Sequence, residues 1–137
     1  MSVNYYMLAA AFLVIVATGA IDDVVSLRPR IKLIGQILAA ALAAAGGLVI
    51  GSIVNPFVPG EYLSLGIFAY PITVVYLVAY TNIINLIDGL DGLATGISGI
   101  AAVTMFSFAV LAGRGDAAAL SIALTGACLA FLRFNFH

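Results

Sequence analysis

Long stretches without a charged residue dominate this sequence and restrict the folds open to it. Charged residues make up 8% of the 137 residues, and hydrophobic residues make up 64%. A soluble domain carries about 25% charged residues, and one of this size could not bury so much apolar surface. The sequence therefore indicates a protein that lies in a lipid bilayer. The uncharged runs are 1–21, 33–60, 62–87, 92–113 and 117–132.

The lengths of these runs predict membrane-spanning helices. A hydrocarbon core about 30 Å thick needs about 20 apolar residues in each spanning helix. Small residues, as in 39–47, let helix backbones approach each other closely within a membrane. We therefore expect an all-α, polytopic integral membrane helix bundle, with residues 1–137 forming a single transmembrane domain. Length and helix-breaking residues predict about five helices, at approximately 3–21, 33–51, 65–84, 94–112 and 117–134.

The basic residues predict the orientation in the membrane. Three of them lie at 28–32, before the second predicted span, and Arg133 follows the last one. With five spans, these residues and the loop at 85–92 share one side, whereas Arg114 lies on the other. Short loops rich in lysine and arginine stay in the cytoplasm, so we expect the shared side to be cytoplasmic. The first residue would then lie outside, which suggests that further spans precede it.

Acidic and carboxamide side chains gather on the same predicted side. Asp22 and Asp23 end the first predicted helix. A charged side chain at the bilayer centre costs about 2.5–3.5 kcal/mol, so a cluster of them indicates a functional site, although a single aspartate can reach the interface at little cost. A second group recurs at every third residue near the end of the third predicted helix: Asn82, Asn85, Asp88 and Asp91.

Oxygen ligands of this kind suit a hard cation. Magnesium is commonly bound by one or two carboxylates together with substrate phosphates. Cys128 and His137 are the single cysteine and histidine, so the sequence offers no cluster typical of zinc. Two adjacent carboxylates, Asp22 and Asp23, offer a base or a further metal ligand, and the basic residues at 28–32 are placed to meet phosphates. We interpret the pattern as a phosphoryl-transfer site, and a net charge of −1 gives no reason to expect a nucleic acid partner.

Three segments resemble the signatures of the polyprenyl-phosphate N-acetylhexosamine-1-phosphate transferases, which are of the glycosyltransferase 4 type. Residues 19–36, with Gly-Ala-Ile-Asp-Asp and Leu-Arg-Pro-Arg-Ile-Lys, resemble the first cytoplasmic signature. Residues 82–96 resemble the second, and 131–137 resemble the lead-in to the third. The segments occur in the order of the family. Their details are most similar to the bacterial undecaprenyl-phosphate N-acetylglucosamine-1-phosphate transferases, rather than to the muramoyl-pentapeptide branch.

The resemblance implies an enzyme of the bacterial plasma membrane whose active-site loops are cytoplasmic. In such enzymes a polyprenyl phosphate, commonly undecaprenyl phosphate, attacks the β-phosphate of a UDP-N-acetylhexosamine. The products are UMP and a lipid-linked sugar diphosphate, and the reaction is the first membrane step of cell-envelope glycan synthesis. The implied cofactor is Mg²⁺, with Mn²⁺ as an alternative, and the resemblance leaves a homodimer open.

The same resemblance implies roles for individual residues. Asp22 and Asp23 would be catalytic, with Asp22 acting as a base or positioning the lipid phosphate. Asn85 and Asp88 would lie at the metal and the diphosphate. The other matching positions would bind substrate: Lys32 near the phosphates, Asn82 by shaping the loop at the metal and the diphosphate, and Asp91 and Asn135 at the uridine.

Several readings compete with this one. Members of the family have more spans, and a further metal-binding aspartate would lie beyond His137. We therefore expect these residues alone not to catalyse the reaction at a useful rate, so an inactive fragment or half of a split protein is an alternative. An ion-coupled transporter would place its acids near the bilayer midplane. A prenyltransferase would space its aspartates by four residues, and a CDP-alcohol phosphotransferase would carry Ala-Arg shortly after Asp91-Gly92.

Overall fold

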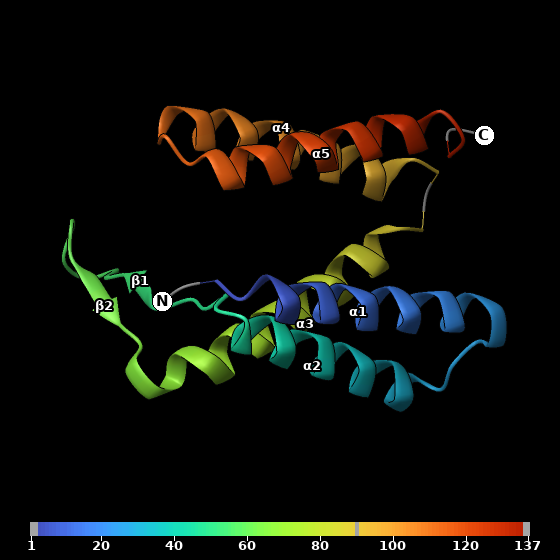
Figure 1. Ribbon diagram of the computed structural model, residues 1–137, viewed down its shortest axis with the longest axis horizontal. Helices are drawn as coiled ribbons and strands as arrows, with labels where there is room; N and C mark the ends of the chain where they lie inside the picture. The colour runs from blue at the N-terminus through green and yellow to red at the C-terminus, as the bar shows by residue number, and fades with distance from the viewer. Residues whose placement is uncertain (1–2, 90, 136–137) are drawn as a thin grey trace. The chain divides into compact units, whose positions relative to one another are not determined.

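The computed structural model describes residues 3–89 and 91–135, and helices make up most of it (Figure 1). Two short strands, β1 (Ser52–Val54) and β2 (Tyr62–Ser64), pair antiparallel, and a 3₁₀ turn covers Gly66–Phe68. The predicted all-α, polytopic membrane bundle is confirmed. The α-helices are α1 (Tyr5–Val25), α2 (Pro29–Ala45), α3 (Ala69–Ile87), α4 (Leu93–Leu111) and α5 (Gly115–Leu132).

Four helical segments among the described residues are long and apolar enough to cross a membrane. The prediction of about five spans is thus confirmed by length and composition for four of them. The second predicted span falls short, because α2 has 17 residues and begins with basic side chains. The four segments are Tyr5–Val25, Gly66–Ile87, Leu93–Leu111 and Gly115–Leu132.

Helix α2 nevertheless runs beside α1 over almost the whole length of that helix. At one end the Asn4 N–H donates to the Gly46 carbonyl at 2.9 Å, and at the other Lys32 Nζ lies 2.8 Å from Asp22 Oδ2. The α-helical rise puts residues 4 and 22 about 27 Å apart. Small residues make this contact close, since a Cβ on Gly35 would overlap the Thr18 side chain. The two helices therefore lie side by side along almost all of α1.

The end of α2 differs from the prediction. The helix was expected over 33–51 and instead covers Pro29–Ala45. It begins at Pro29 because proline fits the first helical position, and it ends because Gly47 adopts a φ of 98°, a left-handed conformation typical of a helix terminus. The apolar residues that follow leave the helix, and the Ile50 N–H donates to Thr73 Oγ1 at 2.9 Å.

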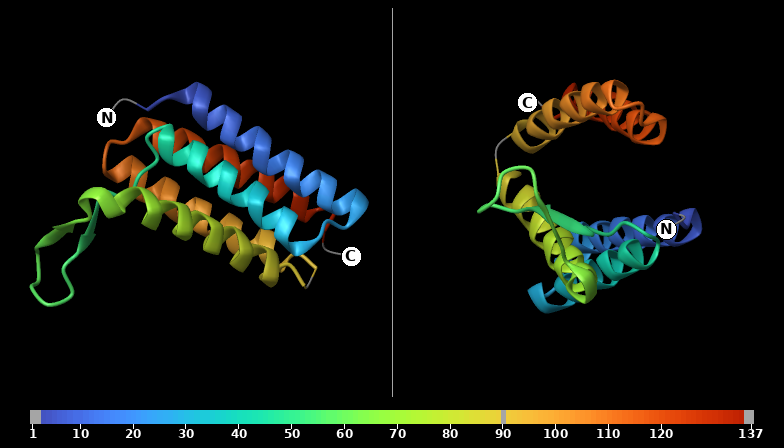
Figure 2. Two further views of the ribbon diagram at one scale, coloured as in Figure 1. Left: turned by 90° about the horizontal axis from the view of Figure 1, so that it is seen from below. Right: turned by 90° about the vertical axis from the view of Figure 1, so that its left-hand side faces the viewer.

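Contacts divide the chain into two compact units, Met1–Thr81 and Asn82–His137. The single transmembrane domain stays a prediction. In the first unit α3 runs antiparallel to α2, because Thr73 bonds to the segment after α2, whereas Thr81 lines the same cavity as Gln36 near the start of α2. The end of α1, the start of α2 and the part of α3 around Thr81 therefore lie at one end of this unit, as Figure 2 shows.

The second unit is built around an antiparallel pair of helices, α4 and α5. Gly113, with a φ of 66°, makes the turn between them. Small side chains again line the contact: Ala102 and Cys128 are buried, and a Cβ on Gly99 would lie 3.5 Å from that of Cys128. This pattern is the close approach through small residues that membrane helices use.

Candidate functional site

The first acidic pair lies in the last turn of α1. That helix ends at Val25 rather than at the predicted residue 21, so Asp22 and Asp23 are helical. Ser26 then closes the helix in the left-handed conformation, with a φ of 51°, and its N–H donates to the Asp22 carbonyl at 2.8 Å. The main chain of Asp22 is therefore fixed by the helix end.

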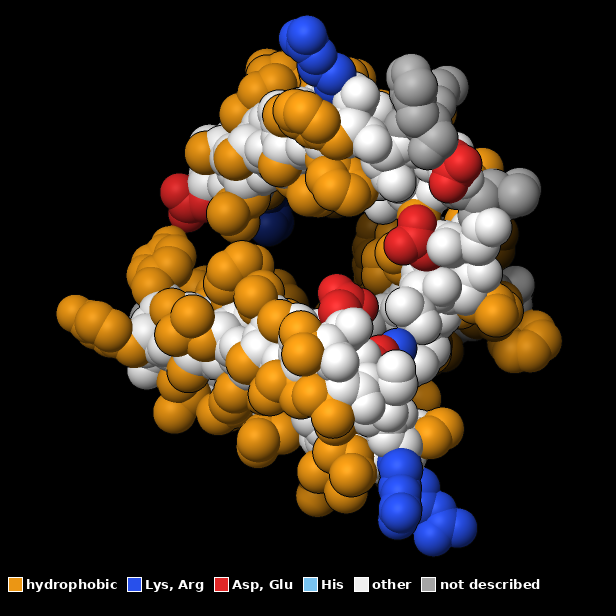
Figure 3. All heavy atoms as spheres, turned by 90° about the vertical axis from the view of Figure 1, so that its right-hand side faces the viewer, with side chains coloured by type: hydrophobic (Ala, Val, Ile, Leu, Met, Phe, Trp, Pro, Cys, Tyr) orange, Lys and Arg blue, Asp and Glu red, His pale blue; other side chains and the backbone are white. Residues whose placement is uncertain are grey.

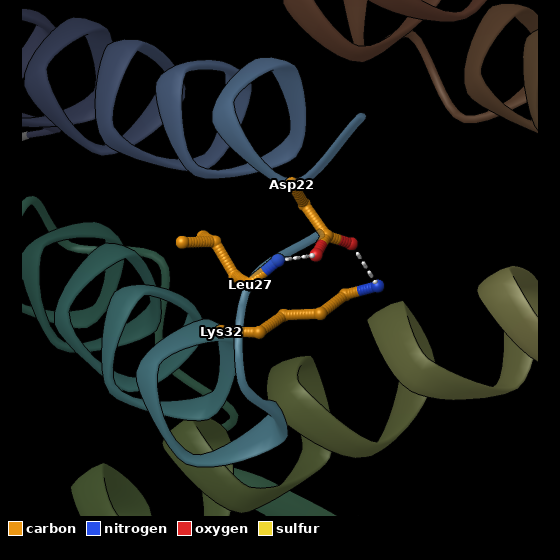
Figure 4. Close-up of polar contacts among 3 residues, drawn as sticks. All are labelled: Asp22, Leu27 and Lys32. Atoms are coloured by element: carbon orange, nitrogen blue, oxygen red, sulfur yellow. Dashed lines mark hydrogen bonds and ion pairs between the residues drawn. The ribbon is translucent and has the colours of Figure 1, made fainter. Parts of the chain in front are cut away.

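The Asp22 carboxylate is held on both of its oxygens (Figure 4). The Leu27 N–H donates to Oδ1 at 3.0 Å, and Lys32 Nζ lies 2.8 Å from Oδ2. The side chains of Asp22 and Lys32 retain 21% and 26% of their exposure, so both stay accessible to a ligand. Charge-assisted bonds of this kind fix orientation as well as position. The structure thus joins two predicted site residues that are ten positions apart.

The Asp23 side chain has a different orientation from that of Asp22. It is exposed, and successive residues of an α-helix point about 100° apart, so it cannot face α2 as Asp22 does. Arg28 and Arg30 are also exposed near the start of α2. Figure 3 looks toward this end of the helices, where charged side chains gather while hydrophobic side chains cover the helix sides. This end of the first unit can therefore meet a charged ligand at the membrane surface.

The second polar group begins on α3. That helix ends at Ile87, three residues after the predicted 84, so Asn82 and Asn85 lie one turn apart on it. Asp88 follows in the turn, and its N–H donates to the Ile84 carbonyl at 3.2 Å. All three polar side chains are exposed. Of the polar residues that recur at every third position, only Asn82 and Asn85 therefore lie on a helix.

Gly92 ends the turn between α3 and α4. Its φ of 74° is one that residues with a Cβ rarely adopt. Asp91 lies in the same turn and is exposed, two residues before α4 begins at Leu93. The turn leaves the Asp91 side chain accessible beside the start of a helix.

Asn135 returns to this end of the second unit. Its Nδ2 donates to Thr95 Oγ1 at 3.5 Å, across 40 positions of sequence. Its backbone N–H donates to the Phe131 and Leu132 carbonyls, so the turn after α5 fixes the main chain of Asn135. Thr95 has no role in the sequence-based prediction, although its hydroxyl lies four residues after Asp91.

The predicted site residues offer oxygen ligands, which are the type that a hard cation prefers. The part of the chain that the structure describes holds no group of three or more His, Cys, Asp or Glu side chains that could bind a metal. The predicted metal pair, Asn85 and Asp88, offers one carboxamide and one carboxylate, and phosphates and water commonly complete such a site for Mg²⁺. The catalytic, metal and substrate roles of the site residues stay predictions. His137 lies outside the described residues.

Comparison with known proteins finds relatives over most of the chain. The sequence profile of glycosyl transferase family 4 matches residues 5–137. A probable undecaprenyl-phosphate N-acetylglucosaminyl 1-phosphate transferase of Bacillus subtilis (strain 168) is 40% identical over 93% of this chain and 35% of its own length. A phospho-N-acetylmuramoyl-pentapeptide-transferase of Moorella thermoacetica is 40% identical over 87% of this chain and 41% of its own length.

A third relative, the phospho-N-acetylmuramoyl-pentapeptide-transferase of Desulfitobacterium hafniense, is 38% identical over 98% of this chain and 47% of its own length. The chain thus spans less than half the length of these curated relatives. The apolar helices and these relatives together show a multi-pass membrane protein. The chain belongs to glycosyl transferase family 4.

Proposed function

We propose that the protein transfers N-acetylhexosamine-1-phosphate from a UDP-sugar to a polyprenyl phosphate, undecaprenyl phosphate in bacteria, and releases UMP. The observation that carries this proposal is the Asp22–Lys32 pair at the end of a membrane-long helix. It lies within the segment that matches glycosyl transferase family 4. Relatives named for transfer of sugar 1-phosphate or phospho-sugar groups support the same reaction class.

The position of the pair suits a lipid phosphate. The polyprenyl chain stays in the bilayer, so its phosphate must be met at the membrane surface, where α1 ends. The ammonium of Lys32 can move from the Asp22 carboxylate to that phosphate, since both ligands are anionic oxygens. Asp22, still bonded to the Leu27 N–H, would then face the nucleophile as a base or as an orienting group.

The second polar group suits the nucleotide sugar. In this proposal Asn85 and Asp88 hold Mg²⁺, or Mn²⁺ in its place, together with the diphosphate, and Asn82 shapes the same segment. When bound, the cation would neutralise the diphosphate and stabilise UMP as the leaving group. Asp91 and Asn135 would bind the uridine, and Thr95 would keep Asn135 in place through its 3.5 Å contact.

The basic residues support a cytoplasmic site. Arg28, Arg30 and Lys32 lie at the same end of the first unit as Asp22, and such loops are retained in the cytoplasm. The proposed location is therefore the bacterial plasma membrane with the site on its inner face, where nucleotide sugars occur. The helix-end position of the acids gives no support to an ion-coupled transporter, whose acids lie near the midplane.

The test is Mg²⁺-dependent exchange of radiolabelled UMP with UDP-N-acetylglucosamine in membranes that contain undecaprenyl phosphate and the protein, together with any further polypeptide that its activity requires. Exchange follows from the reverse reaction, so it requires both the donor site and the lipid acceptor. We expect exchange that stops on chelation of the metal and returns with Mg²⁺ or Mn²⁺. Exchange that does not depend on undecaprenyl phosphate would contradict the proposed acceptor. Absence of exchange with both UDP-N-acetylglucosamine and UDP-N-acetylmuramoyl-pentapeptide would contradict the proposed reaction.

A further inference from the structure

The β1–β2 hairpin is an ordered segment that the proposed reaction does not use. Its register pairs Ile53 with Leu63 and Val54 with Tyr62. Because side chains alternate between the faces of a strand, these two pairs lie on opposite faces. Both faces of the hairpin therefore carry apolar side chains, although Ser52 and Ser64 share the face of Val54 and Tyr62, whereas a hairpin on a soluble core has one polar face.

The loop of the hairpin displays further apolar side chains on a fixed backbone. The Asn55 N–H donates to the Glu61 carbonyl at 2.9 Å, and the Phe57 N–H donates to Asn55 Oδ1 at 3.0 Å. Phe57 is nevertheless 88% exposed, and Tyr62 is 73% exposed. Glu61 is the only charged residue between positions 33 and 87, and its Oε2 accepts from Asn55 Nδ2 at 3.2 Å.

The hairpin lies at the end of the first unit that is opposite the Asp22–Lys32 pair. Helix α2 starts beside Asp22 and ends at Ala45, and the carbonyl of the following Gly46 accepts from the Asn4 N–H before the start of α1. The hairpin follows that end of α2, and the candidate span Gly66–Ile87 begins two residues after β2. Covalent continuity thus holds the hairpin at the edge of the bilayer.

The backbone and the side chains of the hairpin favour different environments. A sheet of two strands has two open edges, whose unpaired N–H and C=O groups cannot lie in hydrocarbon. The exposed apolar side chains are unfavourable in water, because removal of apolar surface from water lowers the free energy. The headgroup region satisfies both, and it is where aromatic residues of membrane proteins gather.

We propose that the β1–β2 hairpin is an interfacial anchor, with Phe57 and Tyr62 inserted into the lipid headgroup boundary on the side of the membrane opposite Asp22. The partner is the lipid surface itself. The anchor fixes the depth at which the following span enters the bilayer, because the 3₁₀ turn Gly66–Phe68 and α3 follow β2 without a flexible linker. This role is independent of the proposed reaction.

The sequence contains no tryptophan, so a single introduced one reports on its own surroundings. We would prepare Phe57→Trp and Tyr62→Trp in the full chain and reconstitute each, at low protein-to-lipid ratio, into vesicles of phosphatidylcholine and phosphatidylglycerol. The matched control is Phe12→Trp in the middle of α1, where Phe12 is 65% exposed. Fluorescence is then measured with lipids brominated near the headgroup, with lipids brominated near the chain end, and with aqueous iodide.

The anchor predicts that both hairpin variants are quenched more by lipids brominated near the headgroup, and that Phe12→Trp shows the reverse order. Quenching by iodide without quenching by either lipid would place the hairpin in water and overturn the proposal. Shielding from all three quenchers would indicate contact with protein, whether another segment or a second copy, and would overturn it equally. The same depth as Phe12→Trp would also contradict it.

Discussion

At the scale of single residues, the best-defined feature of the site is the pair formed by Asp22 and Lys32. The resemblance to the family marked both residues as functional, and the structure adds that they touch at 2.8 Å. The third member of the arrangement, the Leu27 N–H, could not be predicted. Its position depends on the left-handed Ser26, and serine carries no strong sequence signal for that conformation.

Substitutions of Asp22 should separate its two contacts. Asp22→Asn keeps an oxygen for the Leu27 N–H and removes the charge that pairs with Lys32, whereas Asp22→Ala removes both contacts. We expect Asp22→Ala to lower the free energy of unfolding by about 1 kcal/mol more than Asp22→Asn, the net value of a hydrogen bond. Thermal unfolding in detergent measures the difference, and equal stabilities would show that the Leu27 bond contributes nothing.

Lys32→Gln tests the phosphate-binding role of the lysine. A partly exposed ion pair contributes about 0–1 kcal/mol to stability, so the loss of folding free energy should be small. Transfer activity should fall about 10- to 100-fold, because a charge-assisted bond to the phosphate is worth about 1.5–3 kcal/mol. Arg30→Gln is the matched control, and the proposed role is wrong if both variants lose activity equally.

Thr95→Val tests whether the contact with Asn135 positions the uridine-binding group. The change removes the hydroxyl that accepts from Asn135 Nδ2 and keeps the shape of the side chain. We expect a KM for the UDP-sugar about 3- to 10-fold higher, from loss of about 1 kcal/mol, with little change in kcat. Thr104→Val is the control, since the Thr104 hydroxyl bonds only to the Ile100 carbonyl of its own helix among the contacts described. A raised KM in both variants would argue against a specific role for Thr95.

At the scale of elements, the uncharged runs predicted where helices lie better than where they end. α1, α3, α4 and α5 all fall on the predicted segments. The predicted helix at 33–51 extended past Ala45 because residues 46–51 continue the apolar run, and hydrophobicity alone does not show that Gly47 adopts the left-handed conformation that ends α2. The hairpin was not predicted, since strands of three residues have too short a pattern to detect.

The contact between α1 and α2 predicts opposite effects for two identical substitutions. Gly35→Ala places a Cβ against the Thr18 side chain, and overpacking of this kind costs about 1–3 kcal/mol. Gly126→Ala in α5 meets open space and should stabilise its helix by about 1 kcal/mol. Thermal unfolding followed by circular dichroism measures both. A stabilising Gly35→Ala would contradict the close packing of α1 on α2.

At the scale of the whole molecule, the chain corresponds to less than half of its curated relatives. We therefore expect the active species to contain more polypeptide than these 137 residues, either in a longer chain or in a second one. Intact mass of the native protein in its source membranes, detected through the loop at 55–62, should exceed 14.1 kDa, or a 14.1 kDa species should co-purify with a partner. A 14.1 kDa species that is active by itself would contradict this expectation.

The central claim is that Asp22 serves sugar-1-phosphate transfer to a lipid phosphate. The most direct test measures transfer of radiolabelled N-acetylglucosamine-1-phosphate from UDP-N-acetylglucosamine to undecaprenyl phosphate, in membranes carrying the active species with either Asp22→Asn or Asp116→Asn. Asp116 is an exposed aspartate in the first turn of α5 and has no role in the proposed site. The account predicts that Asp22→Asn lowers transfer about 100-fold or more, while Asp116→Asn transfers label normally. Near-normal transfer by Asp22→Asn would contradict the claim.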